Sequence, residues 1–163
     1  MKIAVGREGV CCIPPGVCRL WHGVDGNWEK TMLFDELPWQ GAVVLGVWID
    51  RSAPGIADRV DVDIAWPCGK RQRLSFLDCY RCHITMNWGV VAEEVVLTAR
   101  KTWVKNEDAG FLEKWHAIGV DLNALACYAL VTEATRSAIQ IYAMRFMLAD
   151  IEEDRDAGYC QDS

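Results

Sequence analysis

The 163-residue sequence is poor in histidine, on which hydrolytic triads and many metal centres draw. It contains only three histidines, and none of them lies in the signature of a hydrolytic enzyme: His22, His83 and His116. A nucleophile elbow, a phosphate-binding loop and a dinucleotide fingerprint are also missing. Catalytic groups need only meet in the folded chain, but these absences favour a protein that is not an enzyme.

Long apolar runs are absent as well. The longest apolar stretch covers residues 42–49, which is far too short to cross a bilayer. The first eight residues do not resemble the apolar part of an export signal. We therefore expect a cytoplasmic protein that makes no membrane contact, and we expect its eight cysteines to be thiols rather than disulfides.

An excess of positive charge is also missing, because the formal net charge is −6. Six acids and one arginine give the segment from Asp150 onward a charge of −5, so the first 149 residues are close to neutral. Nonspecific nucleic-acid binding requires a broad basic surface, which we therefore do not expect. The charge pattern predicts a single globular domain over residues 1–149 and an acidic C-terminal tail over residues 150–163.

The clearest local pattern is a β-hairpin. Apolar and polar residues alternate over residues 59–66 and again over residues 70–77, with Pro67-Cys68-Gly69 between them. This register places Val62 opposite Leu74 on one face and Asp63 opposite Arg73 on the other. Asp61 and Asp63 share the second face, and we interpret them as members of an exposed, salt-bridged surface rather than as paired catalytic carboxylates.

Further strands and one helix complete the predicted fold. Alternating patterns predict strands over residues 17–21, 32–34, 42–49, 80–87, 95–103, 125–132 and 138–148, and an apolar phase shift near Met144 suggests a bulge. Phe111, Leu112, Trp115 and Ile118 share one face of a helix that Gly119 is suited to end. We predict an α+β fold that is predominantly antiparallel β, either a sandwich or a strongly curved sheet, with one short amphipathic helix packed on it.

Cys79-Tyr80-Arg81-Cys82-His83 matches the pattern of covalent haem attachment. Such attachment normally follows export, and in a regular strand Cys79 and Cys82 would face opposite sides of the sheet. We therefore expect no cofactor. The alternative hypothesis is a zinc site that uses Cys79, Cys82 and His83, completed by Cys68 or by an N-terminal cysteine: Cys11, Cys12 or Cys18.

Tryptophan is unusually abundant, with eight copies. Trp66, Trp103 and Trp115 fit core patterns, whereas four others lie near predicted turns and are the candidate binding residues: Trp21, Trp28, Trp39 and Trp88. Exposed tryptophans are frequent energetic centres of protein interfaces. The leading hypothesis is a noncatalytic protein-binding module that blocks its partner by surface occlusion, as bacterial immunity proteins and anti-defence inhibitors do. A small-molecule-binding protein or enzyme with an aromatic-lined pocket is a further alternative.

Overall fold

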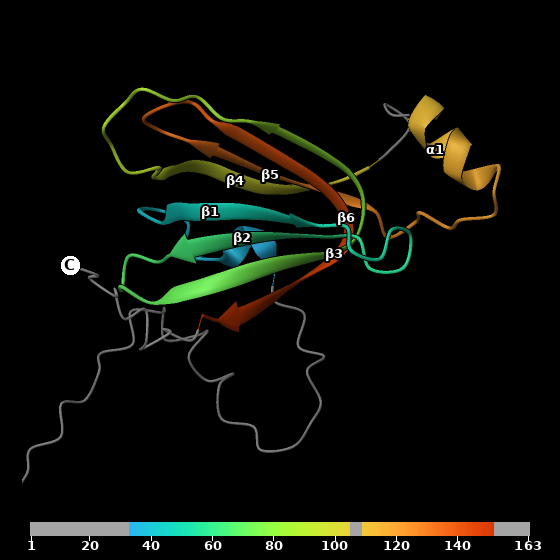
Figure 1. The fold of residues 1–163 in the computed structure, drawn as a ribbon, viewed down its shortest axis with the longest axis horizontal. Helices are drawn as coiled ribbons and strands as arrows, with labels where there is room; N and C mark the ends of the chain where they lie inside the picture. Colours follow the sequence, from blue (N-terminus) through green and yellow to red (C-terminus); the bar gives the residue numbers. More distant parts are fainter. Residues whose placement is uncertain (1–32, 105–108, 152–163) are drawn as a thin grey trace, which may run out of the picture.

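The computed structural model describes residues 33–104 and 109–151. Within them, six antiparallel strands form a sheet in the order β1-β2-β3-β6-β5-β4 (Figure 1). The strands are β1 (Val43–Asp50), β2 (Arg59–Ala65), β3 (Arg71–Thr85), β4 (Val96–Trp103), β5 (Ala126–Thr132) and β6 (Ala138–Asp150). A 3-10 turn, η2 (Phe34–Glu36), and a short helix, α1 (Ala109–His116), complete the described chain. The predicted fold class is confirmed.

The hairpin of β2 and β3 has the predicted register. Val62 lies opposite Leu74 and Asp63 lies opposite Arg73. In the connection, the Gly69 amide donates to the Trp66 carbonyl over 2.8 Å, and Gly69 has a φ of +83° that a side chain would strain. The alternation of apolar and polar residues and the glycine in the turn therefore both favour this hairpin.

The sheet bends sharply and folds into two layers. Residues before Asp78 in β3 pair with β2 and with the C-terminal half of β6, whereas residues after it pair only with the first half of β6. Asp78 has a φ of +55°, and the register shifts by one residue between Cys79 and Arg81. Figure 1 shows β3 and β6 running through both layers and turning near α1. A single strand therefore covers residues 71–85, where the sequence had suggested two.

The two outer strands meet at the end of the sheet away from α1. Val43 in β1 forms a bridge with Val95, just before β4. The Val44 amide donates to the Glu94 carbonyl over 2.9 Å, and the Val96 amide donates to the Ala42 carbonyl over 2.7 Å. These bonds join the first and last strands of the sheet order, so the folded sheet is partly closed into a barrel.

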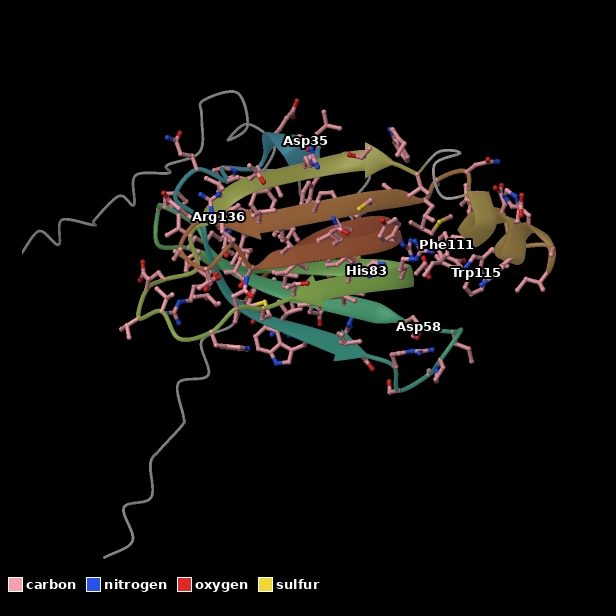
Figure 2. All side chains as sticks on the ribbon, turned by 90° about the horizontal axis from the view of Figure 1, so that it is seen from above. Asp35, Asp58, His83, Phe111, Trp115 and Arg136 are labelled. Carbon is pink, nitrogen blue, oxygen red and sulfur yellow. The ribbon has the colours of Figure 1, made fainter. Side chains whose placement is uncertain are left out.

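Aromatic rings fill the space between the layers. Phe34 of η2 packs against Phe76 and Phe146 of one layer and against Tyr128 of the other, with ring centres 5.1–6.2 Å apart. Figure 2 shows η2, marked by Asp35, beside β4, where the Asp35 carboxylate accepts the Lys101 amide over 2.7 Å. The strand predicted over residues 32–34 is therefore wrong at Phe34, because that residue enters the core through a 3-10 turn.

Helix α1 lies beside the bend of the sheet. Trp115 packs edge-on against Tyr80 with ring centres 4.8 Å apart, and the Arg81 guanidinium lies 3.9 Å from the centre of the Phe111 ring. Gly119 follows the helix with a φ of +79°, as its predicted role at the helix end requires. Ile118 is exposed, so its predicted place on the buried face is wrong.

Asp61 and Asp63 are buried, which contradicts the predicted exposed surface. They keep only 5% and 6% of their surface accessible, although they lie on the outer face of the sheet. Arg73 binds Asp63 through two nitrogens at 2.7 and 3.0 Å, and Arg59 approaches Asp61 to 3.3 Å. The long arginine side chains cover the carboxylates. The alternating sequence pattern shows which face of the strand a residue lies on, but it does not show such cover by a neighbouring side chain.

Two further predictions concern the ends of the chain: the acidic tail from residue 150 and the strand over residues 17–21. β6 extends to Asp150, which accepts a hydrogen bond from Gln72 over 2.6 Å and pairs with Lys70 at 2.8 Å, so the first residue of the predicted tail belongs to the sheet. Residues 152–163 and the strand predicted over residues 17–21 lie outside the described residues. Among the described helices, none is both long and apolar enough to cross a membrane.

Candidate functional site: an exposed apolar loop

The structure separates the four candidate tryptophans. Trp39 is 9% exposed, donates its ring N–H to the Phe34 carbonyl over 2.7 Å and packs against Trp66. Its predicted place on a binding surface is therefore wrong. Trp88, in contrast, keeps 84% of its surface exposed. Trp21 and Trp28 lie outside the described residues.

Trp88 belongs to the connection between β3 and β4, which we call the apolar loop (residues 87–94). Val90 is about half exposed and Val91 is fully exposed beside it. Three large apolar side chains therefore face solvent within four consecutive residues. Scattered exposed apolar residues are ordinary on protein surfaces, but a contiguous group on a protruding segment is typical of an interaction site.

Hydrogen bonds hold the start of the apolar loop against the turn between β5 and β6. The Asn87 amide donates to the Ser137 hydroxyl over 3.0 Å. The Asn87 side-chain NH₂ donates to the Thr135 carbonyl over 2.9 Å. Figure 1 shows the loop curving around this turn. The backbone immediately before Trp88 is thus fixed to a second element of the sheet.

The end of the apolar loop is held by the same turn. The Thr135 hydroxyl donates to the Glu94 carboxylate over 2.9 Å and lies 2.6 Å from the Ser137 hydroxyl. The buried Thr132 hydroxyl accepts the Ser137 amide over 3.1 Å. The Glu133 amide also donates to the Val95 carbonyl over 2.8 Å. Because both ends are bonded, the exposed residues lie on a restrained backbone rather than on a free loop.

Two residues with positive φ shape this region. Gly89 follows Trp88 with a φ of +94°, which only glycine adopts without strain. Arg136 lies in the turn between β5 and β6 with a φ of +57°, an uncommon conformation for a residue with a Cβ atom. Figure 2 shows Arg136 at the opposite end of the molecule from Phe111 and Trp115. The site therefore lies away from α1.

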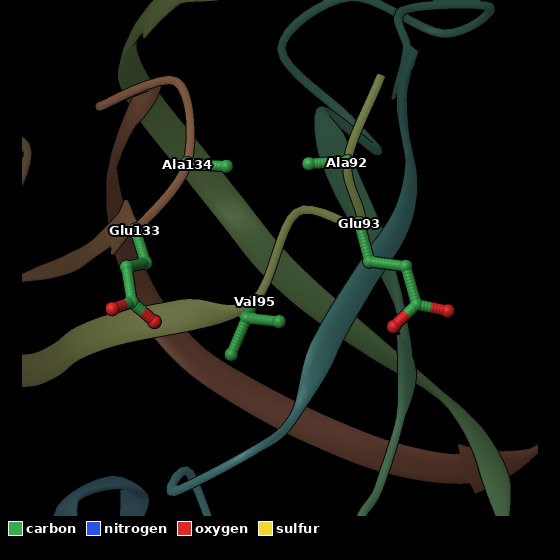
Figure 3. Close-up of a pocket in the computed structure, with 5 residues that line it drawn as sticks. All are labelled: Ala92, Glu93, Val95, Glu133 and Ala134. Atoms are coloured by element: carbon green, nitrogen blue, oxygen red, sulfur yellow. The ribbon is translucent and has the colours of Figure 1, made fainter. Parts of the chain in front are cut away.

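An open hollow of about 370 Å³ lies between the apolar loop and the turn. It is lined by Ala92, Glu93, Val95, Glu133 and Ala134. Figure 3 shows the two alanines facing one another across the opening, with the two carboxylates on either side of Val95. The lining is apolar and acidic and contains no aromatic ring, so it differs from the aromatic pocket considered from the sequence.

The proposed zinc ligands do not converge. Because of the bend and bulge in β3, Cys79 and Cys82 both pack against the core, so the expectation that they face opposite sides is wrong. His83 is exposed and lies near Tyr142, with ring centres 6.2 Å apart. In the described part of the chain, no three histidine, cysteine or acidic side chains are grouped as a metal site requires. Cys11, Cys12 and Cys18 lie outside it.

Trp88 was predicted from the sequence as a binding residue, but the residues around it were not. Val90 and Val91 resemble a buried strand pair by composition, and Glu93 and Glu133 are ordinary surface residues in sequence. The one signal was Gly89, which interrupts the strand pattern between Trp88 and the valines.

Comparison with models of protein families, with curated proteins and with solved structures gives no match for this chain.

Proposed function

We propose that this protein is a noncatalytic protein-binding module of the cytoplasm, which acts by covering a surface of its partner. The apolar loop is the proposed contact, with Trp88 at its centre. The observation that supports this proposal is the exposure of Trp88, Val90 and Val91 on a backbone bonded at both ends. A restrained loop loses less conformational freedom on binding, so more of its apolar contact energy appears as affinity.

The residue types support a protein partner. Tryptophan is enriched among the residues that dominate protein interfaces, and truncating such a residue costs about 2 kcal/mol or more. That energy corresponds to a loss of about 30-fold or more in affinity. Glu93 and Glu133 beside the loop give the surface an acidic edge, which disfavours nucleic acid.

The test is partner capture from the native host with the full-length chain. Trp88→Ala should lose at least about 30-fold in affinity for a stoichiometric partner. Trp103→Ala is the matched control, because Trp103 is a half-exposed tryptophan on β4, outside the loop. Both variants should unfold at the same denaturant concentration as the unmodified chain. Absence of a stoichiometric partner under several growth conditions, or equal capture by Trp88→Ala, would contradict the proposal.

A further inference from the structure

We infer that the open edge of β1 pairs with β1 of a second copy of this chain, so that two molecules form an antiparallel dimer. This inference does not depend on the proposed function, because it uses a different surface from Trp88. β1 is one of the two outer strands in the order of the sheet, so only one of its edges is paired with a neighbouring strand. Figure 2 shows β1 at the border of the sheet on the side opposite to Asp35.

The second edge of β1 is open from Leu45 to Asp50. Before it, the Val44 amide is bonded to the Glu94 carbonyl, but no backbone hydrogen bond joins the edge itself to another described residue. The other outer strand, β4, is covered, because its Lys101 amide donates to the Asp35 carboxylate of η2 over 2.7 Å. Unpaired backbone groups along an edge are a template for another strand. A β-strand is therefore the occupant that the backbone of β1 fits.

The side chains along this edge are apolar and partly exposed. Leu45, Trp48 and Ile49 keep 46%, 50% and 58% of their surface exposed. Ile49 lies in one row with Val60 and Phe76 across the sheet, and both of these are buried in the core. Its exposure therefore shows where the core-facing row lacks a neighbour.

The usual protections of an edge strand are missing where the edge is regular. Residues 45–49 include no charged residue and no proline, which natural edge strands use to prevent pairing. The bulge of β1 lies between Val44 and Gly46, and the register is continuous from Gly46 to Asp50. The regular part of the edge is therefore long enough to pair with a second strand.

Trp48 is held in place at the middle of this edge. A Cβ atom at Gly46 would collide with the Trp48 ring, so the ring lies against the backbone of that glycine. The Arg73 guanidinium lies 5.3 Å from the centre of the ring and is itself bound by Asp63 through two nitrogens. A half-exposed ring that is already ordered loses little conformational freedom when a second molecule covers it.

A register centred on Trp48 makes the edge complementary to itself. Trp48 then lies opposite Trp48 of the second copy on the outer face, as the two-fold axis of such a dimer requires. Val47 and Ile49 share the core-facing side of β1, and each lies opposite the other residue in the second copy. Apolar side chains thus meet apolar side chains on both faces of the joined sheet.

The charges at the two ends of the contact favour a second copy. In the same register Arg51, whose side chain is 66% exposed, lies opposite Leu45 of the second copy. The exposed Glu93 is close to that end of the strand, because Glu94 is bonded to Val44. Each copy therefore brings an arginine to one end of the contact and an acidic residue to the other, so antiparallel pairing places opposite charges together.

The first test is sedimentation velocity of the full-length chain from about 1 µM to about 1 mM. A contact of one strand edge is smaller than that of a permanent dimer, so the mean mass should rise with concentration from that of one chain toward that of two. Ile49→Lys should weaken association at least about tenfold, because it places a charge on the edge. Ile118→Lys, at an exposed apolar residue after α1, should associate like the unmodified chain.

The charge contact has its own pair of variants. Glu93→Arg should weaken association about threefold or more, because it faces Arg51 of the second copy. Glu113→Arg makes the same change at an exposed position of α1 and should have no effect. All four variants should unfold at the same urea concentration as the unmodified chain.

Hydrogen exchange of the unmodified chain identifies the contact without any substitution. Amides of residues 46–50 should exchange at least about threefold more slowly at the highest concentration than at the lowest. Amides of residues 88–92 should not change. This measurement decides the matter if Ile49→Lys does not fold.

Each outcome is separate from the proposed function. A single chain at every concentration would overturn the inference, and so would a dimer that Ile49→Lys leaves intact or that protects residues 88–92 alone. Equal association of Glu93→Arg and the unmodified chain would overturn the register. If the chain stays single while Trp88→Ala loses its partner, the inference fails and the proposed function stands. If the dimer forms through β1 while Trp88→Ala captures the partner normally, the proposed function fails instead.

Discussion

At the scale of single residues, burial governs the chemistry of the two thiols in β3. Cys79 and Cys82 are each about half-buried against the core, and Cys79 donates to the Phe76 carbonyl over 3.2 Å. Burial raises the pKa of Cys79 to about 12 and that of Cys82 to about 11. Only the thiolate is a strong nucleophile, so both cysteines are unreactive near neutral pH.

Alkylation with iodoacetamide at about pH 8 should therefore distinguish the cysteines. Cys68 is exposed in the turn between β2 and β3 and should react on the order of tenfold or more faster than Cys79 or Cys82. Peptide mass spectrometry after timed quenching measures the three rates. In denaturant the three should react alike. Equal rates in the folded protein would contradict the burial of the β3 thiols.

Asp58 gives the protein a specific sensitivity to acid. Its carboxylate accepts the Gly55 amide and the Arg51 guanidinium, both over 2.8 Å, and these bonds lower its pKa from the ordinary value of 3.8. A lowered pKa in the folded state contributes stability above 3.8, and that contribution is lost as the pH falls through the folded value.

Asp58→Asn should therefore reduce the fall in melting temperature between about pH 6 and about pH 3. Thermal unfolding followed by circular dichroism at several pH values measures the effect. Glu36→Gln changes an exposed carboxyl in η2 and serves as the control. A pH dependence identical for Asp58→Asn and the unmodified chain would show that the bonds to Gly55 and Arg51 do not stabilise the folded loop.

The burial of a tryptophan was not predictable from its local sequence. Trp66 and Trp103 each end an alternating strand and were both assigned to the core, but Trp66 is buried and Trp103 is 52% exposed, so the assignment of Trp103 was wrong. Trp39 and Trp88 both lie near turns, and their local sequences look equivalent, yet one is buried and the other exposed. The difference arises because Trp39 meets Trp66 and Phe34 in the folded core, and sequence alone does not show that contact.

At the scale of elements, η2 shows how a short segment can carry much of the core. Its one buried side chain, Phe34, packs against rings from β3, β5 and β6 and also against Trp39. Three residues are too few for periodicity to identify, which is why the segment was mistaken for a strand.

Phe34→Ala should destabilise the protein by about 3–5 kcal/mol, because it leaves a cavity between the two layers. Leu33→Ala, which changes a half-exposed neighbour, should alter stability by no more than about 0.5 kcal/mol. Urea unfolding followed by circular dichroism compares the two variants. If Phe34→Ala cost no more than Leu33→Ala, η2 would not be part of the core.

The apolar loop depends on a second element for its conformation. Thr135→Val removes the hydroxyl that contacts Glu94 and Ser137 while keeping a side chain of similar shape. Loop amides between residues 88 and 92 should exchange their hydrogens about tenfold faster, corresponding to about 1.4 kcal/mol of local stability. Hydrogen exchange resolved by mass spectrometry measures this change. Unaltered exchange in the loop would contradict the restraint on which the proposed binding mode depends.

At the scale of the whole molecule, the sequence predicted the pairing of strands that are neighbours in the chain, but it did not predict the pairing of distant strands. The hairpin of β2 and β3 connects neighbouring segments, and its alternating pattern identified it. The pairing of β3 with β6 and the bridge from Val43 to Val95 join residues far apart in sequence. No local sequence pattern identifies such distant partners. The sequence therefore predicted a sandwich or a strongly curved sheet, but it did not predict the strand order, the bend at Asp78 or the closure between the outer strands.

The two layers should unfold as one cooperative unit, because β3 and β6 are continuous through both of them. Val62 lies in β2 of one layer and Leu130 lies in β5 of the other, and both are buried in strands paired on two sides. Under conditions that allow native-state hydrogen exchange, their amides should report the same free energy of opening within about 0.5 kcal/mol. They should also show the same dependence on denaturant. A lower free energy of opening for one layer would mean that the bend at Asp78 separates two folding units that open independently.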